Sequence, residues 1–465
     1  MNPLPTWQLI GIAVGAVALL VVLVTRMKLN PFLALLLAAL VVGAGGVWLG
    51  AGTVVVNGVA VPKTMLDVMK SFQDGLGATL GGVAGVIGLG TMLGKLLAES
   101  GGAEVLAKRF NAFFGPQRVG LCIMALAIAV GLTTWFAVGL ILLLPILLTL
   151  TRETKKPFLL LAIPLLSFLS VMHGLMPPHP GPVVAIDKLH ANMGMVLVWG
   201  FVIGIPTAAI AGPFFARIAI KRLEAQPPPM PEITDRPGLT LPPFGLTLLA
   251  ILLPVMLMLV GTLVELLHAQ NTPFGKVGMF IGNPTIALLV AVLFGLWALG
   301  SRCGYNLPQL LKFTESCIGS IGMTLLVVGG GGGFARVLRD AGVANALGDV
   351  ATQAHLPLLL YAWLVSAFIR VATGSATVAI TVTADLLAPF IAQHTGVNVE
   401  LLIIAIGCGS LFLSHLNDGG FWIVKDCLGL TVPQTLRTWT ITETIIGIVG
   451  LIITIGVDAL VRAFH

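Results

Sequence analysis

Charged side chains are scarce in this sequence, at 9% of its 465 residues. Soluble domains carry about 25% charged residues, so the composition excludes a water-soluble fold. Hydrophobic residues make up 57% of the chain, and apolar runs long enough to cross a bilayer recur along it. Examples are residues 9–24, 32–49, 244–267 and 284–299. The sequence therefore predicts an all-α polytopic membrane protein embedded in a lipid bilayer.

Cysteines and catalytic motifs are also lacking. The five cysteines are scattered and odd in number, so they indicate neither a disulfide framework nor a zinc site. No HExxH, Walker, GxSxG or haem-attachment motif occurs, which argues against an enzyme and against a bound cofactor or metal. The net charge of +6 comes from short basic clusters between apolar runs, so we expect no nucleic-acid partner.

The least apolar stretch of the chain contains a run of prolines and lies near its middle. It predicts a cytoplasmic linker at 221–242, between a first transmembrane repeat at 1–220 and a second at 243–465. Similar segments on the two sides support a repeat, because GKLLAESG begins at Gly94 and ARVLRDAG begins at Ala335. A histidine follows each of these segments at a similar offset.

Basic residues near the ends of spans indicate the cytoplasmic side. They cluster at 26–28, 152–156, 217–222 and 302. If the loop after the first span and the linker are both cytoplasmic, the first half has an odd number of crossings. The second half then runs in the opposite direction, which predicts two inverted-topology repeats of the kind found in secondary transporters.

Breaks in the apolar pattern are the candidate functional segments, since irregular backbone in a bilayer is tolerated only beside protein or a water-filled cavity. The first break, at 170–182, holds four prolines with His173 and His179. It is either a proline-rich external turn or a half-helix end whose imidazoles face a polar cavity.

The second break is a run of five glycines at 329–333, matched by a glycine-rich stretch at 81–90. Glycine at this density either permits close helix packing or forms the tip of a re-entrant hairpin. In the second case Gly331 and Gly332 would offer backbone N–H groups to an anion.

The third break, at 370–377, holds small hydroxyl residues around a glycine inside an apolar region. Either the hydroxyls bond their own backbone, or an unwound stretch binds a hydroxylated solute with the arginine as counter-charge to a carboxylate. The candidate ligands are Arg370, Gly374, Ser375 and Thr377, with Thr133 and Thr134 at the matching place in the first half.

The fourth break, at 414–422, places His415, Asn417 and Asp418 within four positions. An acid at membrane depth is expensive and usually marks the path of an ion or substrate. Asp418 is therefore either a proton carrier or a simple helix cap at a surface turn. Glu443 is a second candidate acid, with packing as its alternative role.

At these segments the sequence closely resembles the gluconate permease family of the ion-transporter superfamily. The matching stretches run from the first loop to the last span and cover almost the whole chain. The most specific are MKLNPF at 27–32, HGLMPPHPGP at 173–182, the glycine run up to Phe334, GSATVA at 374–379, and SHLND at 414–418 followed by Phe421 and Trp422.

The resemblance implies a multi-pass protein of the bacterial inner membrane that imports gluconate or a related sugar acid by proton symport. Members of the family also carry fructuronate, idonate, glycerate-like acids and D-serine, so the resemblance fixes a class of small hydroxylated carboxylates. It also implies a homodimer, since relatives in the superfamily often dimerise.

One position departs from the family pattern. Family members commonly have an acid at the position of Ala137, which is an obvious proton carrier. Coupling would then run through Asp418, Glu443, His173 or His415, or the chain does not couple transport to protons.

These observations predict a secondary active transporter with a central anion site, broken helices, re-entrant hairpins and alternating access. Three alternatives stay open: a D-serine or other small-carboxylate permease of the same family, a passive anion uniporter or channel, and a membrane metalloenzyme. The metalloenzyme would use His173, His179, His415 and Asp418 around a metal ion.

Overall fold

The computed structural model describes residues 6–48, 53–56, 59–221, 223, 225, 227–228, 240–343, 356–391, 396–416 and 418–464. Much of the predicted 221–242 linker lies outside these described residues, and so does Asn417.

The first half of the chain is built from helices that follow one another with short connections. They are α1 (Thr6–Thr25), α2 (Pro31–Trp48), α3 (Met65–Glu99), α4 (Gly102–Phe114), α5 (Val119–Gly131), α6 (Phe136–Thr154), α7 (Phe158–Leu175), α8 (Pro180–Leu189), α9 (Met193–Ala209) and α10 (Phe215–Ala219). The shorter elements are the antiparallel strands β1 (Thr53–Val56) and β2 (Val59–Pro62), the 3-10 helix η1 (Pro116–Arg118) and the π-helix η2 (Ile210–Phe214).

The second half is also helical. Its elements are α11 (Phe244–Leu266), α12 (Pro273–Gly282), α13 (Pro284–Gly295), η3 (Leu296–Gly300), η4 (Ser301–Cys303), α14 (Leu307–Asp340), α16 (Leu358–Thr373), α17 (Ala376–Ile391), α18 (Val399–Leu411), α19 (Gly419–Cys427), α20 (Val432–Thr435), η5 (Leu436–Thr440) and α21 (Ile441–Phe464).

Helical segments of membrane-spanning length dominate the structure. Within the described residues, nine are long and apolar enough to cross a membrane, and the pair α4 and η1–α5, bent by 111°, would be a tenth. The prediction of an all-α polytopic membrane protein is confirmed, with the β1–β2 hairpin added between α2 and α3.

The two halves share the same order of elements. Each contains a very long helix, α3 with 35 residues and α14 with 34. The interrupted pairs α5–α6 and α7–α8 follow in the first half, and α16–α17 and α18–α19 follow in the second. A π-helix then lies just before or within the last long helical segment, η2 in the first half and η5 in the second. This order agrees with the predicted repeats, whose inverted orientation stays a prediction.

The long helices α3 and α14 start with the same local device. Thr64 and Asp67 form a capping box at the start of α3, and Asn306 and Gln309 form one at the start of α14. In a capping box the side chains of the cap and of the third helical residue satisfy each other's free backbone N–H groups. The residues at the start of each helix therefore determine where that helix begins.

The glycine run lies inside α14, where it packs against α3. A Cβ atom on Gly332 would lie 2.0 Å from Thr79 Oγ1, and one on Gly333 would lie 2.7 Å from the Phe72 ring. The predicted re-entrant tip at Gly331 and Gly332 is therefore wrong. Their N–H groups belong to a continuous helix, and the missing side chains let α3 and α14 approach closely.

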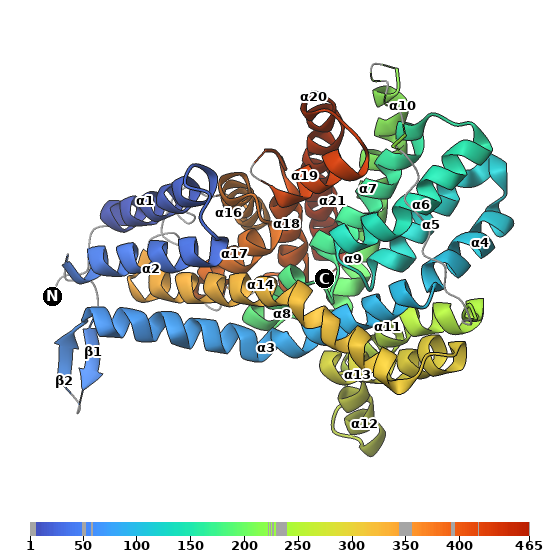
Figure 1. Cartoon of the computed structure of the whole chain (residues 1–465). Coiled ribbons are helices and arrows are strands. Elements are labelled where there is room, and N and C mark those ends of the chain that lie inside the picture. Colours follow the sequence, from blue (N-terminus) through green and yellow to red (C-terminus); the bar gives the residue numbers. More distant parts are fainter. Residues whose placement is uncertain are drawn as a thin grey trace.

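Figure 1 shows how these elements are arranged. The helices α1 and α2 lie with the first part of α3 and the end of α14 at one end of the molecule, and α4, α5 and α6 lie at the other. The helices α7, α8, α17 and α18 lie between these two ends. The pair α7–α8 is thus brought together with α17 and α18 in the middle of the molecule.

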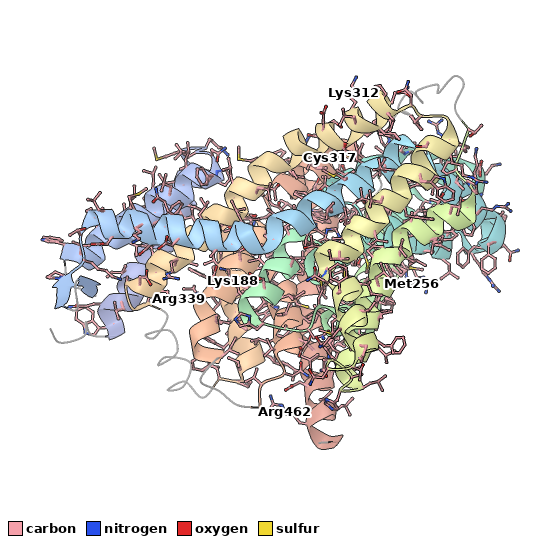
Figure 2. The ribbon with its side chains drawn as sticks, turned by 90° about the horizontal axis from the view of Figure 1, so that it is seen from below. Lys188, Met256, Lys312, Cys317, Arg339 and Arg462 are labelled. Carbon is pink, nitrogen blue, oxygen red and sulfur yellow. The ribbon has the colours of Figure 1, made fainter. Side chains whose placement is uncertain are left out.

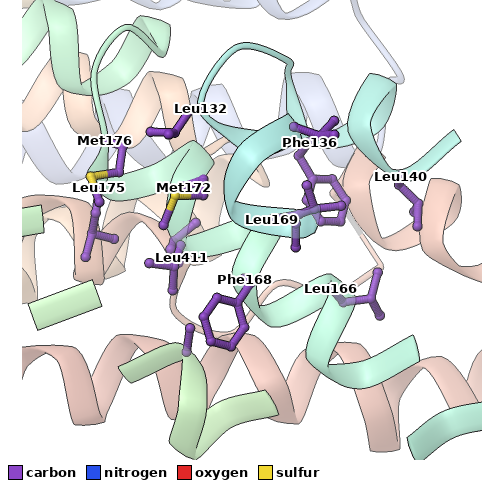
Figure 3. Close-up of a cluster of buried hydrophobic side chains, with 14 of the residues drawn as sticks. Leu132, Phe136, Leu140, Leu166, Phe168, Leu169, Met172, Leu175, Met176 and Leu411 are labelled. Carbon is purple, nitrogen blue, oxygen red and sulfur yellow. The ribbon is translucent and has the colours of Figure 1, made fainter. Parts of the chain in front are cut away.

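The helices α7 and α18 form the centre of the core. All residues of α7 are buried except Leu160 and His173, and all residues of α18 from 401 to 411 are buried. A Cβ atom on Gly407 would lie 2.7 Å from the Gly174 carbonyl oxygen, so the two helices touch through their backbones. Figure 3 shows the apolar side chains around the end of α7, with Leu175 and Met176 beside Leu411. This crossing sets the ends of α7 and α18 beside each other.

Candidate functional site

The breaks of the four interrupted helix pairs lie near the α7–α18 crossing. The pairs are α5–α6, α7–α8, α16–α17 and α18–α19. The first two breaks are joined by His179, whose Nε2 lies 2.7 Å from the Gly131 carbonyl oxygen at the end of α5. His179 is buried, and its ring meets that of His173 edge to face, with the ring centroids 5.0 Å apart. Nδ1 of His173 is buried and has no hydrogen-bond partner among the described residues. The two predicted imidazoles therefore share one enclosed space.

A buried ion pair joins the other two breaks. Arg370 Nη2 at the end of α16 lies 2.5 Å from Asp418 Oδ2, and Arg370 Nη1 donates to the Gly374 carbonyl oxygen at 2.7 Å. Only 4% of Arg370 and 7% of Asp418 are exposed to solvent. The arginine is thus held by a carboxylate of the chain itself, and its Nε is a buried donor with no partner in the described structure.

Both carboxylate oxygens of Asp418 accept further hydrogen bonds. Ser414 Oγ donates to Oδ2, and the Gly420 N–H donates to Oδ1 at 2.7 Å. The second bond caps the start of α19, and this cap is buried rather than placed at a surface turn. The role of Asp418 as a proton carrier stays a prediction. Trp439 Nε1 donates to Ser414 Oγ at 2.7 Å and thereby ties the break to η5.

Glu443 lies in the first turn of α21 and is fully buried. Within the part of the chain that the structure describes, neither of its carboxyl oxygens has a hydrogen-bond partner of ordinary geometry. Its electrostatic neighbours are Ser170 of α7, Arg370 and Asp418, and Arg370 also acts on His173. One arginine, two acids and a histidine therefore converge on the breaks from four helices.

Helix N-termini add positive potential to this site. The helices α6 and α8 begin at the breaks after Trp135 and His179, and neither first turn receives a side-chain cap. The first and third residues of α8 are prolines, so Gly181 supplies the free N–H group at its start. Free N–H groups at the start of a helix and the helix dipole favour an anion. The starts of α17 and α19 are instead capped by Ser375 and Asp418.

The remaining predicted ligands lie at the same breaks but mostly bond their own backbone. The Thr133 and Thr134 hydroxyls donate to the Val130 carbonyl oxygen at 3.3 and 2.8 Å. Gly374 adopts a left-handed conformation with a φ of 72° and ends α16. Thr377 is half-buried in the first turn of α17. Their contact with a solute stays a prediction.

Two predicted residues lie at the margin of the site. His415 is half-buried, and its Nδ1 is 3.0 Å from the Leu413 carbonyl oxygen. Ala137 is half-buried in the first turn of α6. Sequence reasoning missed Ser414 and Trp439 as members of the site. Ser414 could have been found from its place four residues before Asp418, whereas nothing in the sequence pairs it with Trp439.

A cavity of about 450 Å³ lies elsewhere, between α3, α8, α11 and the α12–α13 junction. Asp187 and Glu265 line it, and Glu400 lies next to Glu265. Two lining carboxylates do not suit a negatively charged solute. The breaks, with their arginine and free helix N-termini, suit one better.

Metal binding finds no support in the arrangement of side chains. The described ranges contain no group of three or more histidine, cysteine, aspartate or glutamate side chains placed to hold a metal ion. His415 of the predicted metal set bonds the backbone instead.

Broken helices that bring buried charges together inside an apolar helical molecule define a membrane transporter. Residues 7–461 match the family described as GntP family permease, and the chain belongs to this family. It is a permease of the multi-pass membrane type and not an enzyme, as predicted.

Relatives agree with this assignment, and a solved structure has a similar fold. The chain is 39% identical to "Gluconate permease" of Zymomonas mobilis subsp. mobilis over 96% of this chain and 97% of the relative. It is 40% identical to "Gluconate permease" of Pseudomonas aeruginosa over 93% and 94%. The fold is similar to the YdaH transporter of Alcanivorax borkumensis, with a TM-score of 0.57, 15% identity, and 90% and 97% of the two chains covered.

Proposed function

We propose that the protein is a secondary active transporter that imports gluconate or a related small sugar acid by proton symport with alternating access. The observation that carries the proposal is the buried group of Arg370, Asp418 and Glu443 at the helix breaks, beside the uncapped starts of α6 and α8. The names of the two relatives supply the substrate class.

Charge balance gives the reason for proton coupling. Arg370 already pairs with Asp418, so an arriving carboxylate adds a negative charge to a site that also holds Glu443. Unpaired charge in the low-dielectric interior is costly. A proton taken up by Glu443 or Asp418 removes one negative charge and lets Arg370 share its donors with the substrate. The proton offsets the charge that the substrate carboxylate brings, so substrate and proton cross together with the net charge of the site unchanged.

The substrate itself would be held by different groups at its two ends. Its carboxylate binds between Arg370, the N–H groups at the start of α6 and the Gly181 N–H at the start of α8. Its hydroxyls bond Ser375, Thr377 and His173, whose Nδ1 lacks a partner in the described structure. D-serine would place its ammonium group against Asp418 or Glu443, which keeps this related substrate as the second candidate.

The proposal is tested with purified protein in proteoliposomes. Labelled gluconate should accumulate when the outside is more acidic, and a protonophore should abolish the accumulation. A thermal-shift panel of gluconate, fructuronate, glycerate and D-serine ranks the substrates. Uptake that ignores an imposed pH gradient but follows a sodium gradient would refute proton symport.

A passive anion uniporter is the second candidate function, favoured by one observation. Ala137, at the break before α6, cannot carry a proton. With the membrane potential held at zero, a uniporter would only equalise the gluconate concentrations under a pH gradient, whereas a proton symporter would raise the internal concentration above the external one.

A further inference from the structure

Four aspartate, glutamate, lysine or arginine residues are buried in the described chain: Arg370, Asp385, Asp418 and Glu443. Three of them form the proposed substrate site. Asp385, in α17, lies outside it. Because buried charge in a membrane protein is expensive and usually functional, Asp385 needs a role of its own.

Asp385 is shared by cations from two other helices. Its Oδ1 lies 3.5 Å from Lys188 Nζ, in the last turn of α8, and 3.2 Å from Arg339 Nη2, in the last turn of α14. The arginine also donates to the Asp385 carbonyl oxygen at 3.0 Å. The exposed fractions of the side chains are 3% for Asp385, 17% for Lys188 and 31% for Arg339. Figure 2 shows Lys188 and Arg339 on the same side of the molecule.

The two cations use only one of the two carboxylate oxygens of Asp385. Both cations contact Oδ1, while Asp385 Oδ2 and Arg339 Nε have no hydrogen-bond partner in the described residues. Either cation alone is therefore enough to pair the carboxylate. If one of them withdraws, the other prevents an unpaired buried charge, which is the costly outcome.

The helices α8 and α17 run side by side away from the substrate site. Both begin at a break, and near their starts a Cβ atom on Gly181 would lie 2.6 Å from Ile380 Cδ1. Further along, Lys188 in the last turn of α8 reaches Asp385 in the second half of α17. The α14 helix packs on α3 through Gly332 and Gly333, and it also touches α17, where a Cβ atom on Gly331 would lie 3.2 Å from Thr381 Cγ2. The Lys188 contact thus joins two helices that both start at the site, and the Arg339 contact joins them to α14.

We propose that Asp385 is a positioning residue for the transport cycle, an inference that rests on the proposed function. Its pair with Lys188 persists and keeps α8 and α17 together, so that their starts hold a fixed geometry at the substrate site. Its pair with Arg339 forms and breaks as these helices shift against α14 between the outward-open and inward-open states. Lys188 keeps Asp385 paired while Arg339 is disengaged.

The test compares gluconate uptake by four variants in proteoliposomes. Lys188→Met should lower the maximal rate roughly 100-fold, as expected from an unpaired buried charge in the released state, with KM nearly unchanged. Arg339→Met should have a much smaller effect, because Lys188 still pairs the acid. The double variant Lys188→Met/Asp385→Asn should recover only part of the rate lost in Lys188→Met, because it removes the unpaired charge but does not restore the pair that joins α8 to α17. Lys312→Met, at the exposed start of α14, is the matched control and should behave as wild type.

Folding is checked separately by gel filtration and by the thermal shift that gluconate produces in each variant. Rescue by the double variant, with an unchanged KM, separates positioning from misfolding. An equal loss of uptake rate in Lys188→Met and Arg339→Met, or no rescue by the double variant, would overturn the inference about Asp385. Uptake by the wild-type protein would still support the proposed function in that case. Wild-type protein that neither binds nor transports gluconate or the other acids of the panel would overturn both.

Discussion

The ion pair of Arg370 and Asp418 is enclosed by the ends of two broken helices and reached by Ser414 and, through it, Trp439. A buried pair adds little net stability, because desolvation offsets its attraction, but removing one partner leaves a buried charge uncompensated. This asymmetry makes the pair a sensitive point of the fold as well as of the site.

Asp418→Asn tests this pair. The change should lower the free energy of unfolding by about 3–5 kcal/mol, because Arg370 stays charged and buried. The readout is the melting temperature of the detergent-purified protein. Asp458→Asn is the control, since the pair of Asp458 with Arg462 is partly exposed and such pairs contribute about 0.3–0.5 kcal/mol. Equal melting temperatures for the two variants would contradict the prediction.

Glu443→Gln tests the proton route. Glutamine keeps the shape of the side chain but cannot exchange a proton at neutral pH, so accumulation driven by a pH gradient should be lost. Exchange of labelled for unlabelled gluconate across the membrane should continue, since exchange needs no net proton movement. Glu315→Gln on the exposed face of α14 is the matched control. Undiminished accumulation in Glu443→Gln would exclude this acid as the carrier.

Ala137→Glu tests the departure from the family pattern. The new carboxyl would lie in the first turn of α6, at a break of the site. We expect it to increase gluconate uptake driven by a pH gradient in proteoliposomes. Unchanged uptake would show that coupling in this chain does not depend on that position.

The helix breaks were predictable because prolines, histidines and hydroxyl residues interrupt apolar runs at 170–182, 370–377 and 414–422. The glycine run was not, since the same composition suits a hairpin tip and a close helix contact. What decides between them is α3, whose Thr79 and Phe72 lie far away in the sequence. The same limit hid Trp439 from the predicted site, because a hydrogen bond between distant segments leaves no local pattern.

Gly332→Ala tests the packing of α3 on α14. A Cβ atom there would meet Thr79 Oγ1 at 2.0 Å and the Gly75 carbonyl oxygen at 2.9 Å, so overpacking should cost about 1–3 kcal/mol. Gly322→Ala in the same helix is the control, because nothing lies within 4 Å of its Cβ position. It should be neutral or stabilising by up to about 1 kcal/mol. Melting temperatures that fall equally in both variants would refute the close contact.

At the scale of the whole molecule, the recurrence of a long helix, two interrupted pairs and a π-helix in each half supports the proposed duplication. Sequence similarity alone showed one pair of short matching segments, because membrane helices share an apolar composition and lose other traces of repetition. The direction of each half relative to the bilayer depends on the basic loops and needs its own test.

Cysteine labelling gives that test. Cysteines introduced at Lys155, after α6, and at His268, after α11, should react with an impermeant maleimide from opposite sides of the membrane. Lys155 lies in a basic loop, and α11 leads away from the linker that is predicted to be cytoplasmic. Cys427→Ser gives a suitable background, since the other native cysteines are buried. Labelling of both positions from one side would refute the inverted orientation.

The contact of Gly174 with Gly407 has a mechanical consequence. Two backbones already in contact cannot come closer, and pulling them apart would open a void in a closely packed core. Rotation about the contact is the motion that costs least. In the proposed transport cycle, the crossing of α7 and α18 would therefore act as a pivot, about which the surrounding helices tilt while the charged groups beside it barely move.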